Sequence, residues 1–146
     1  MRTLGALIAV AALVVGACSS GDGDKTAGDA TTTTTVATIP EANLQAQASV
    51  LTDALIAQKW DEVVSHFDTR MQENLTAAGL KQAWDQVVTA YGPYKARGTP
   101  ARVHVVSSLT VFDTPMTFGS EPMKSRFSFD HDGKVGGLFI LKADAP

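Results

Sequence analysis

Among the histidines and carboxylates of this sequence, His104 and Asp113 are the candidates for acid–base chemistry. His104 lies in a β-rich segment, on the strand face that also carries Val106 and Phe112. Because histidine titrates near neutral pH, it could act as a general base on the wall of a pocket. A hydrogen-bonded histidine in the core or at a strand edge fits the same pattern and is the favoured interpretation. Asp113 ends the segment and could face the mouth of a pocket, but Thr114-Pro115 directly after it indicates a turn.

The other patterns do not indicate catalytic or metal-binding machinery. No two of the three histidines have the spacing of metal ligands. There is no Gly-x-Ser-x-Gly elbow of a serine hydrolase. Gly136-Gly137 lies inside a strand pattern and not in a phosphate-binding loop. The sequence therefore predicts no metal and no cofactor, and it favours a protein that is not an enzyme.

A single cysteine, Cys18, follows an apolar run from Leu4 to Val15, and Arg2 is the only charge ahead of it. A basic start, a short apolar run and small residues are typical of a secretory signal. The run is shorter than the ~20 residues of a membrane span. The pattern resembles bacterial lipoprotein signals, which are cleaved before the cysteine. That resemblance implies a diacylglycerol thioether on Cys18 and an anchor in the cell membrane, facing the extracytoplasmic side. An ordinary signal with an incidental cysteine is the less favoured alternative.

A polar segment separates the signal, residues 1–17, from the rest of the chain. Residues 18–39 consist mainly of Gly, Asp, Ser, Ala and Thr, with five consecutive threonines from Thr31 to Thr35. Such a segment cannot bury enough apolar surface to offset its chain entropy, so we expect a disordered tether. The threonines could carry sugars or form a plain spacer, and the spacer is favoured.

Residues 40–146 are long enough for one domain. The whole chain has 12 Lys and Arg against 15 Asp and Glu, a formal net charge of −3. It shows no run of basic residues, so we expect no binding to nucleic acid.

Helical periodicity dominates the first half of this domain. Apolar residues recur at helical spacing over residues 41–58 and again from Trp60 to Met71, where Asp68-Thr69 favours a break and a new cap. A third pattern begins at the predicted cap Thr76 and ends at Gly92-Pro93.

After Pro93 the pattern changes to the alternation of strands. We expect a strand over residues 102–113, a short one at 116–118, a half-exposed one at 123–129, and a last one from Val135 to Lys142. Asp132-Gly133 predicts a hairpin turn, and Gly136-Gly137 predicts a bulge or a close approach of two backbones. Helices followed by strands predict an α+β domain, with helices packed on one face of a four- to five-stranded antiparallel sheet.

Several of these runs resemble a bacterial family of unknown function. Residues 58–64 resemble its loop-to-helix step, residues 75–84 its capped third helix, residues 91–94 its helix-ending glycine, and residues 132–138 its closing hairpin. The resemblance covers nearly all of residues 41–142. The family occurs in secreted lipoproteins and ahead of some bacterial α/β-hydrolase domains. No hydrolase domain is appended here, so we expect no hydrolase activity.

The same family is similar to a cone-shaped, cystatin-like α+β fold shared by nuclear transport factor two, SnoaL-type cyclases and ketosteroid isomerase. That resemblance implies a curved sheet with a pocket inside. Ketosteroid isomerase-like folds use pocket acids for proton transfer. Here that role would fall to His104 or Asp113.

Six side chains are candidates for lining such a pocket: Trp84, Tyr91, His104, Phe112, Phe127 and Phe139. The aromatic ones could equally form the core between helices and sheet, which is the favoured interpretation. We expect a non-catalytic binding or interaction module at the membrane surface, with a small apolar ligand or an envelope protein as its partner. The alternatives are a small isomerase- or cyclase-type enzyme and a structural homodimer formed through the exposed sheet face.

Overall fold

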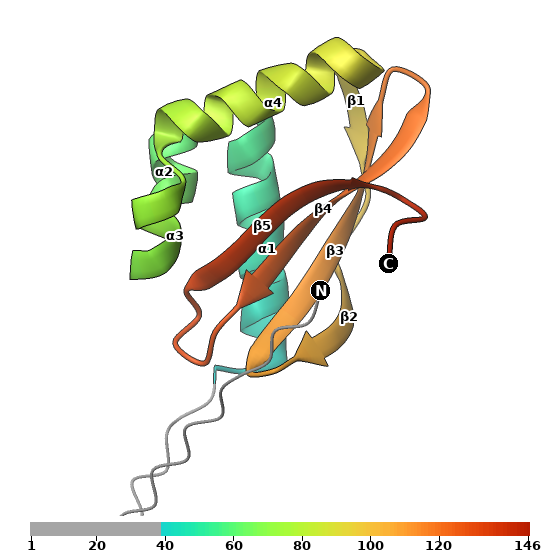
Figure 1. Cartoon of the computed structure of the whole chain (residues 1–146). Helices are drawn as coiled ribbons and strands as arrows, with labels where there is room; N and C mark the ends of the chain where they lie inside the picture. The colour runs from blue at the N-terminus through green and yellow to red at the C-terminus, as the bar shows by residue number, and fades with distance from the viewer. Residues whose placement is uncertain (1–38) are drawn as a thin grey trace, which may run out of the picture. The chain divides into compact units, whose positions relative to one another are not determined.

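The computed structural model describes residues 39–146 (Figure 1). The predicted signal, Cys18 and the threonine run lie outside the described residues. Within residues 39–146 the helices are α1 (Glu41–Ile56), α2 (Trp60–Ser65), α3 (Thr69–Asn74) and α4 (Ala77–Tyr91). The strands are β1 (Tyr94–Arg97), β2 (Ala101–Val106), β3 (Leu109–Phe118), β4 (Glu121–Phe129) and β5 (Val135–Lys142). This order confirms the predicted α+β class.

The five strands form one antiparallel sheet in the order β1-β3-β4-β5, and β2 also pairs with β3. α1 packs against β3 and β4, and α4 crosses the end of the sheet at which α1 ends (Figure 1). We call the side covered by the helices the inner face and the opposite side the outer face. Four phenylalanines of the inner face are fully buried and form the centre of the core: Phe112, Phe118, Phe127 and Phe129.

The helix boundaries follow from local capping. The Asp68 carboxylate accepts a hydrogen bond from the Met71 amide at 2.6 Å, and the Thr76 hydroxyl accepts one from the Gly79 amide at 3.2 Å. Gly92 has a φ of 92°, which a residue with a side chain rarely adopts, and it ends α4. The predicted break at Asp68, the cap at Thr76 and the stop at Gly92 are confirmed.

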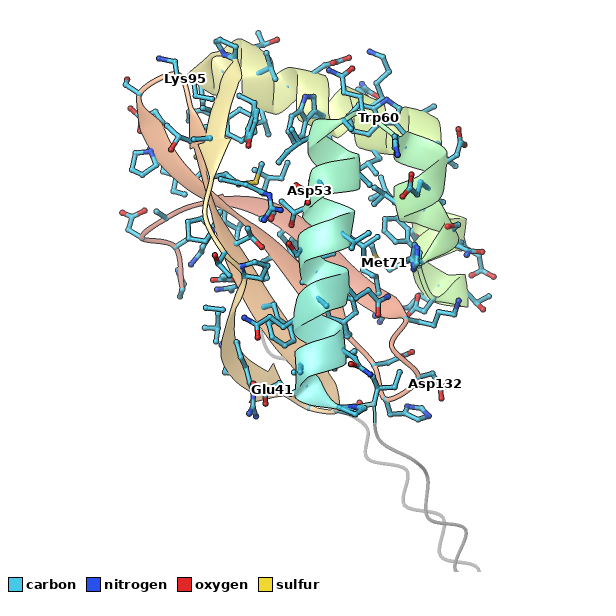
Figure 2. All side chains as sticks on the ribbon, turned by 180° about the vertical axis from the view of Figure 1, so that it is seen from behind. Glu41, Asp53, Trp60, Met71, Lys95 and Asp132 are labelled. Atoms are coloured by element: carbon cyan, nitrogen blue, oxygen red, sulfur yellow. The ribbon has the colours of Figure 1, made fainter. Side chains whose placement is uncertain are left out.

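An ion pair also connects α1 to β1. The Asp53 carboxylate lies 2.6 Å from both Nε and Nη2 of Arg97, a bidentate arrangement. Figure 2 shows Asp53 on the side of α1 that faces β1. The contact fixes the C-terminal half of α1 over the edge of the sheet.

The single strand predicted over residues 102–113 is wrong. The chain reverses at Ser107-Ser108, with Ser107 at a φ of 57°, so this stretch forms β2 and the start of β3. The alternation continues on both sides of the two serines, and neither is a residue that strongly indicates a turn with positive φ.

The predicted turn at Thr114-Pro115 is also wrong, because β3 runs unbroken to Phe118. The Pro115 carbonyl accepts a hydrogen bond from the Gly98 amide at 2.8 Å, between the end of β1 and the start of β2. The nitrogen of Pro115 points to the same gap between β1 and β2. No partner strand requires an N–H donor there, so the sheet tolerates a proline at this position. Residues 116–118 therefore extend β3 and form no separate strand.

The closing hairpin is confirmed. Gly133 has a φ of 72° in the turn between β4 and β5. The ladder shifts register between Ser128 and Phe129, opposite the glycine pair. A Cβ on Gly136 would lie 3.3 Å from Asp68 Oδ2, so this glycine allows the close approach of β5 to the start of α3.

Candidate functional site

An open groove of about 370 Å³ lies between α4 and the inner face of β5. Its volume falls in the range of ligand pockets, roughly 300–1,000 Å³. Leu75, in the turn before α4, also borders it. The side chains along its length are Leu80, Ala83, Trp84, Gln86, Val87, Ala90 and Tyr91 from α4 and Leu138 and Ile140 from β5.

Trp84 forms a rigid part of the groove wall. Its ring is buried, and its centroid lies 5.2 Å from that of Phe118 in an edge-to-face arrangement. Trp60 and Tyr94 contact the same indole at 6.1 and 6.4 Å between centroids. These aromatic contacts hold Trp84 in one position, so this wall is preformed.

The groove is apolar and contains no acid–base pair. Its polar side-chain groups are the Gln86 amide, the Tyr91 hydroxyl and the indole N–H of Trp84, and no histidine or carboxylate lines it. Near one end the Lys142 ammonium lies 5.9 Å from the centroid of the Tyr91 ring. The groove can therefore hold an apolar group by excluding water, and its lining does not bring a histidine and a carboxylate together for acid–base chemistry.

The six predicted pocket residues lie in different parts of the structure. Trp84 and Tyr91 line the groove. Phe112 and Phe127 are fully buried in the core. Phe139 is 54 % exposed on the outer face, where it is paired across the ladder with Arg126.

His104 does not line the groove and does not share a face with Phe112. It is exposed, and it lies opposite Val111 across the ladder between β2 and β3. The chain reversal at Ser107-Ser108 places His104 with Val111 on the outer face. A single continuous strand would have placed it with Phe112.

Asp113 is held in an ion-pair network on the outer face. Its Oδ1 lies 2.7 Å from Arg126 Nε, and its Oδ2 lies 2.8 Å from Arg126 Nη2 and 3.1 Å from Lys124 Nζ. Burial by itself would raise the pKa of Asp113, but the hydrogen bonds from Arg126 and Lys124 outweigh it and hold that pKa below its ordinary value. The Asp113 carboxylate is therefore charged at neutral pH, has a structural role and is a poor base.

The chain after β5 covers this network. Lys124 Nζ donates to the Ala145 carbonyl, and Arg126 Nη1 donates to the Pro146 carbonyl at 2.6 Å. The side chain of Asp113 is only 13 % exposed as a result. His104 and Asp113, the two candidates for proton transfer, both lie on the face of the sheet opposite to the groove.

Most of the residues that line the groove were not among the pocket candidates predicted from the sequence. Ala83, Val87 and Ala90 lie on one side of α4 at helical spacing, next to the stripe that contains Leu80 and Trp84. The sequence did carry one signal for these residues. The apolar stripe of α4 is wider than packing against a single neighbouring element requires. Leu138 and Ile140 carried no such signal, because their alternation fits an ordinary core strand.

Three further properties of residues 39–146 concern metal ligands, buried polar atoms and the helices. In this part of the chain no three His, Cys, Asp or Glu side chains gather in a way that could hold a metal ion. Every buried side-chain nitrogen or oxygen described has a hydrogen-bond partner. None of the helices from α1 to α4 is both long and apolar enough to cross a membrane.

A protein-family model matches residues 48–138, and its description is "Protein of unknown function (DUF3887)". The matched range begins within α1 and ends in β5, so it includes α4 and reaches Leu138 in the groove. The comparisons with curated proteins and with solved structures gave no match.

Proposed function

The chain belongs to the DUF3887 family of proteins of unknown function, and we propose that it is a membrane-anchored bacterial lipoprotein whose extracytoplasmic domain is a non-catalytic binding module. The start of the sequence supports the anchor, and the groove between α4 and β5 supports the binding site.

The support for the anchor is the order of residues at the start of the chain. Arg2, the apolar run from Leu4 to Val15 and Cys18 follow one another as in a lipoprotein signal. A diacylglycerol on Cys18 would supply two acyl chains, and two chains give a stable anchor where a single chain gives a reversible one. The polar segment after Cys18 would then connect the domain to the outer surface of the membrane.

The apolar groove is the observation that carries the binding function. Its walls expose Ala83, Val87 and Ala90 opposite Leu138 and Ile140, and it has the volume of a ligand site. Filling it would remove this apolar surface from water, which is worth roughly 25 cal/mol per Å². Catalysis lacks comparable support, because the two candidate acid–base residues lie on the outer face.

The proposed relationship to the cone-shaped superfamily of nuclear transport factor two and SnoaL-type cyclases has architectural support. The helices precede the strands and cover one face of an open, antiparallel sheet. A fold of this kind hosts both enzymes and binding proteins, so the function is argued from the groove and not from the fold.

Native mass spectrometry of the mature full-length chain, released from bacterial membranes in detergent, tests the binding function. Ala83→Phe would fill the groove from an exposed position of α4, and Ala78→Phe makes the same change on α4 outside the groove. We expect a co-purifying apolar molecule or polypeptide on the wild type and on Ala78→Phe, and its loss from Ala83→Phe. A bare chain in all three samples would contradict a binding module.

A further inference from the structure

We propose that the groove and the free edge of β5 together bind an extended apolar peptide segment of a partner protein, which joins the sheet as a further strand beside β5. This inference rests on the proposed function, because it names the occupant of the same groove. It combines three observations, on the backbone, the side chains and the charges around β5.

The first observation is a row of free backbone groups. β5 ends the sheet, and its ladder partner is β4. On its other side Val135 bonds to the backbone of His66 and Asp68, both at 2.9 Å. Arg70 Nη2 donates to the Gly136 carbonyl at 3.3 Å. Among the described residues, no backbone bond is made on that side from residue 137 to residue 141.

The two edges of the sheet differ in how they are protected against pairing with a strand of another molecule. The edge opposite β5 is formed by β1 and β2, which both pair with β3. β1 is only four residues long, follows Pro93 and has a register shift against β3, and β2 carries the charged Arg102 and has a register shift next to it. β5 is eight residues long, and its run from Gly137 to Leu141 contains no charge and no proline. An exposed edge strand that is long and lacks prolines, charges and register shifts can pair with an added strand. The unprotected edge is also the one that borders the groove.

The second observation concerns the side chains. Residues of an added strand alternate between the two faces of the sheet. Those on the inner face would enter the groove beside Leu138 and Ile140 and opposite Val87 on α4. Those on the outer face would lie next to Phe139, which is 54 % exposed. The edge thus supplies backbone bonds, and the groove selects large apolar side chains at every second position.

The third observation is the charge at the two ends of the edge. Arg70 lies at Gly136 together with the Asp68 carboxylate, at the other end Lys142 lies over Tyr91, and no carboxylate lines the groove itself. This favours a segment with an acidic residue next to its apolar part at the Lys142 end. The free stretch, residues 137–141, spans about 17 Å at ~3.3 Å per residue, the length of five strand residues.

Three other occupants fit less well. An acyl chain would fill the groove but leave the backbone of β5 without partners. A second copy paired through β5 in antiparallel fashion would place Lys142 of each copy beside Arg70 of the other. The nearby Asp68 carboxylate already accepts a hydrogen bond from the Met71 amide of α3. The threonines from Thr31 to Thr35 of the chain itself are too small and polar for the groove.

The test uses the mature full-length chain in detergent and a mixture of synthetic peptides, Glu-Thr-x-Thr-x-Thr-Glu, with Leu, Ile, Val or Phe at x. Native mass spectrometry measures which peptides bind, and hydrogen exchange measures the amides of residues 137–141. We expect binding, with slowed exchange at Leu138 and Ile140, whose amides point away from β4. We expect at least tenfold weaker binding to Ala83→Phe, unchanged binding to Ala78→Phe, and loss of binding when the backbone of the peptides is N-methylated.

Several outcomes would overturn this inference. Peptide binding that survives N-methylation would show that the β5 edge is not used. A dimer of the chain with protected amides at residues 137–141 would show that a second copy covers the edge. A third outcome is that palmitate binds, no peptide binds, and Ala83→Phe abolishes the binding of palmitate. This result would overturn the peptide proposal but would still support a binding module. Binding of neither, together with no co-purifying molecule, would overturn both proposals.

Discussion

The Oγ1 atom of Thr52 on α1 lies 3.3 Å from the Oγ atom of Ser125 on β4, in the fully buried interior of the domain. Thr114 of β3 completes the cluster, also at 3.3 Å from Thr52 Oγ1. The Thr52 hydroxyl additionally contacts the Ala48 carbonyl at 2.8 Å. These three hydroxyls lie where α1 crosses the centre of the sheet, so they fix the position of α1 relative to β3 and β4.

Thr52→Val should destabilise the domain by about 1–3 kcal/mol, because it leaves the buried hydroxyls of Thr114 and Ser125 without a partner. Urea unfolding, followed by tryptophan fluorescence, measures the change. Thr89→Val is the matched control, because the Thr89 hydroxyl makes the same bond to the carbonyl four residues earlier, Asp85, but on the exposed side of α4. It should cost no more than about 0.5 kcal/mol. Equal losses for the two variants would show that the cluster has no special role.

Asp113→Asn should destabilise the folded chain by about 3 kcal/mol at pH 7, because Arg126 and Lys124 lose their buried counter-charge. The pKa of Asp113 is lowered in the folded state, so its contribution is complete above the unfolded pKa of about 4. The contribution of Asp113 to stability is lost as the pH falls through the pKa that Asp113 has in the folded state. The difference between wild type and variant should therefore shrink when unfolding is measured at progressively lower pH, below about pH 4.

Asp85→Asn is the control for this pH dependence. Asp85 pairs with Lys81 on the exposed surface of α4, and such pairs contribute about 0.3–0.5 kcal/mol. A difference for Asp113→Asn that stays constant from pH 7 down to pH 3 would contradict the structural role of the carboxylate.

Local signals in the sequence predicted the helical half of the fold well. Asp68, Thr76 and Gly92 act within one turn of their own helix, so their residue types alone indicate the boundaries. The reversal at Ser107-Ser108 has no comparable local signal. It depends on the pairing of β2 with β3, and β-branched and apolar residues continue on both sides of it.

The candidate site was harder to predict than the fold for the same reason. Trp84 and Tyr91 were predicted because aromatic residues at helical spacing stand out in the sequence. The groove itself arises where Val87 on α4 comes to lie opposite Leu138 on β5, about fifty positions later in the chain. Composition and periodicity do not report how two such distant elements pack. They also do not report which edge of a sheet stays unpaired.

His104→Ala should change neither binding in the groove nor, beyond about 0.5 kcal/mol, the stability, because His104 is exposed on the outer face. Native mass spectrometry of the variant, together with urea unfolding, measures both quantities. His131→Ala, an exposed histidine in the β4–β5 turn, serves as the control. Loss of a bound molecule in His104→Ala alone would restore the enzyme alternative, which relies on this residue.

Cys18→Ser should abolish the lipid anchor. In the wild type we expect the mature chain to begin at Cys18, to carry the added mass of a diacylglycerol and to fractionate with membranes. Serine cannot form the thioether, so the variant should lack that mass. Ser19→Ala changes the neighbouring residue and should leave the modification intact. Intact-mass spectrometry of the three chains, recovered from membrane and soluble fractions, makes the comparison. An unmodified wild-type chain that begins elsewhere would contradict the anchor, while the groove between α4 and β5 could still be tested as a binding site.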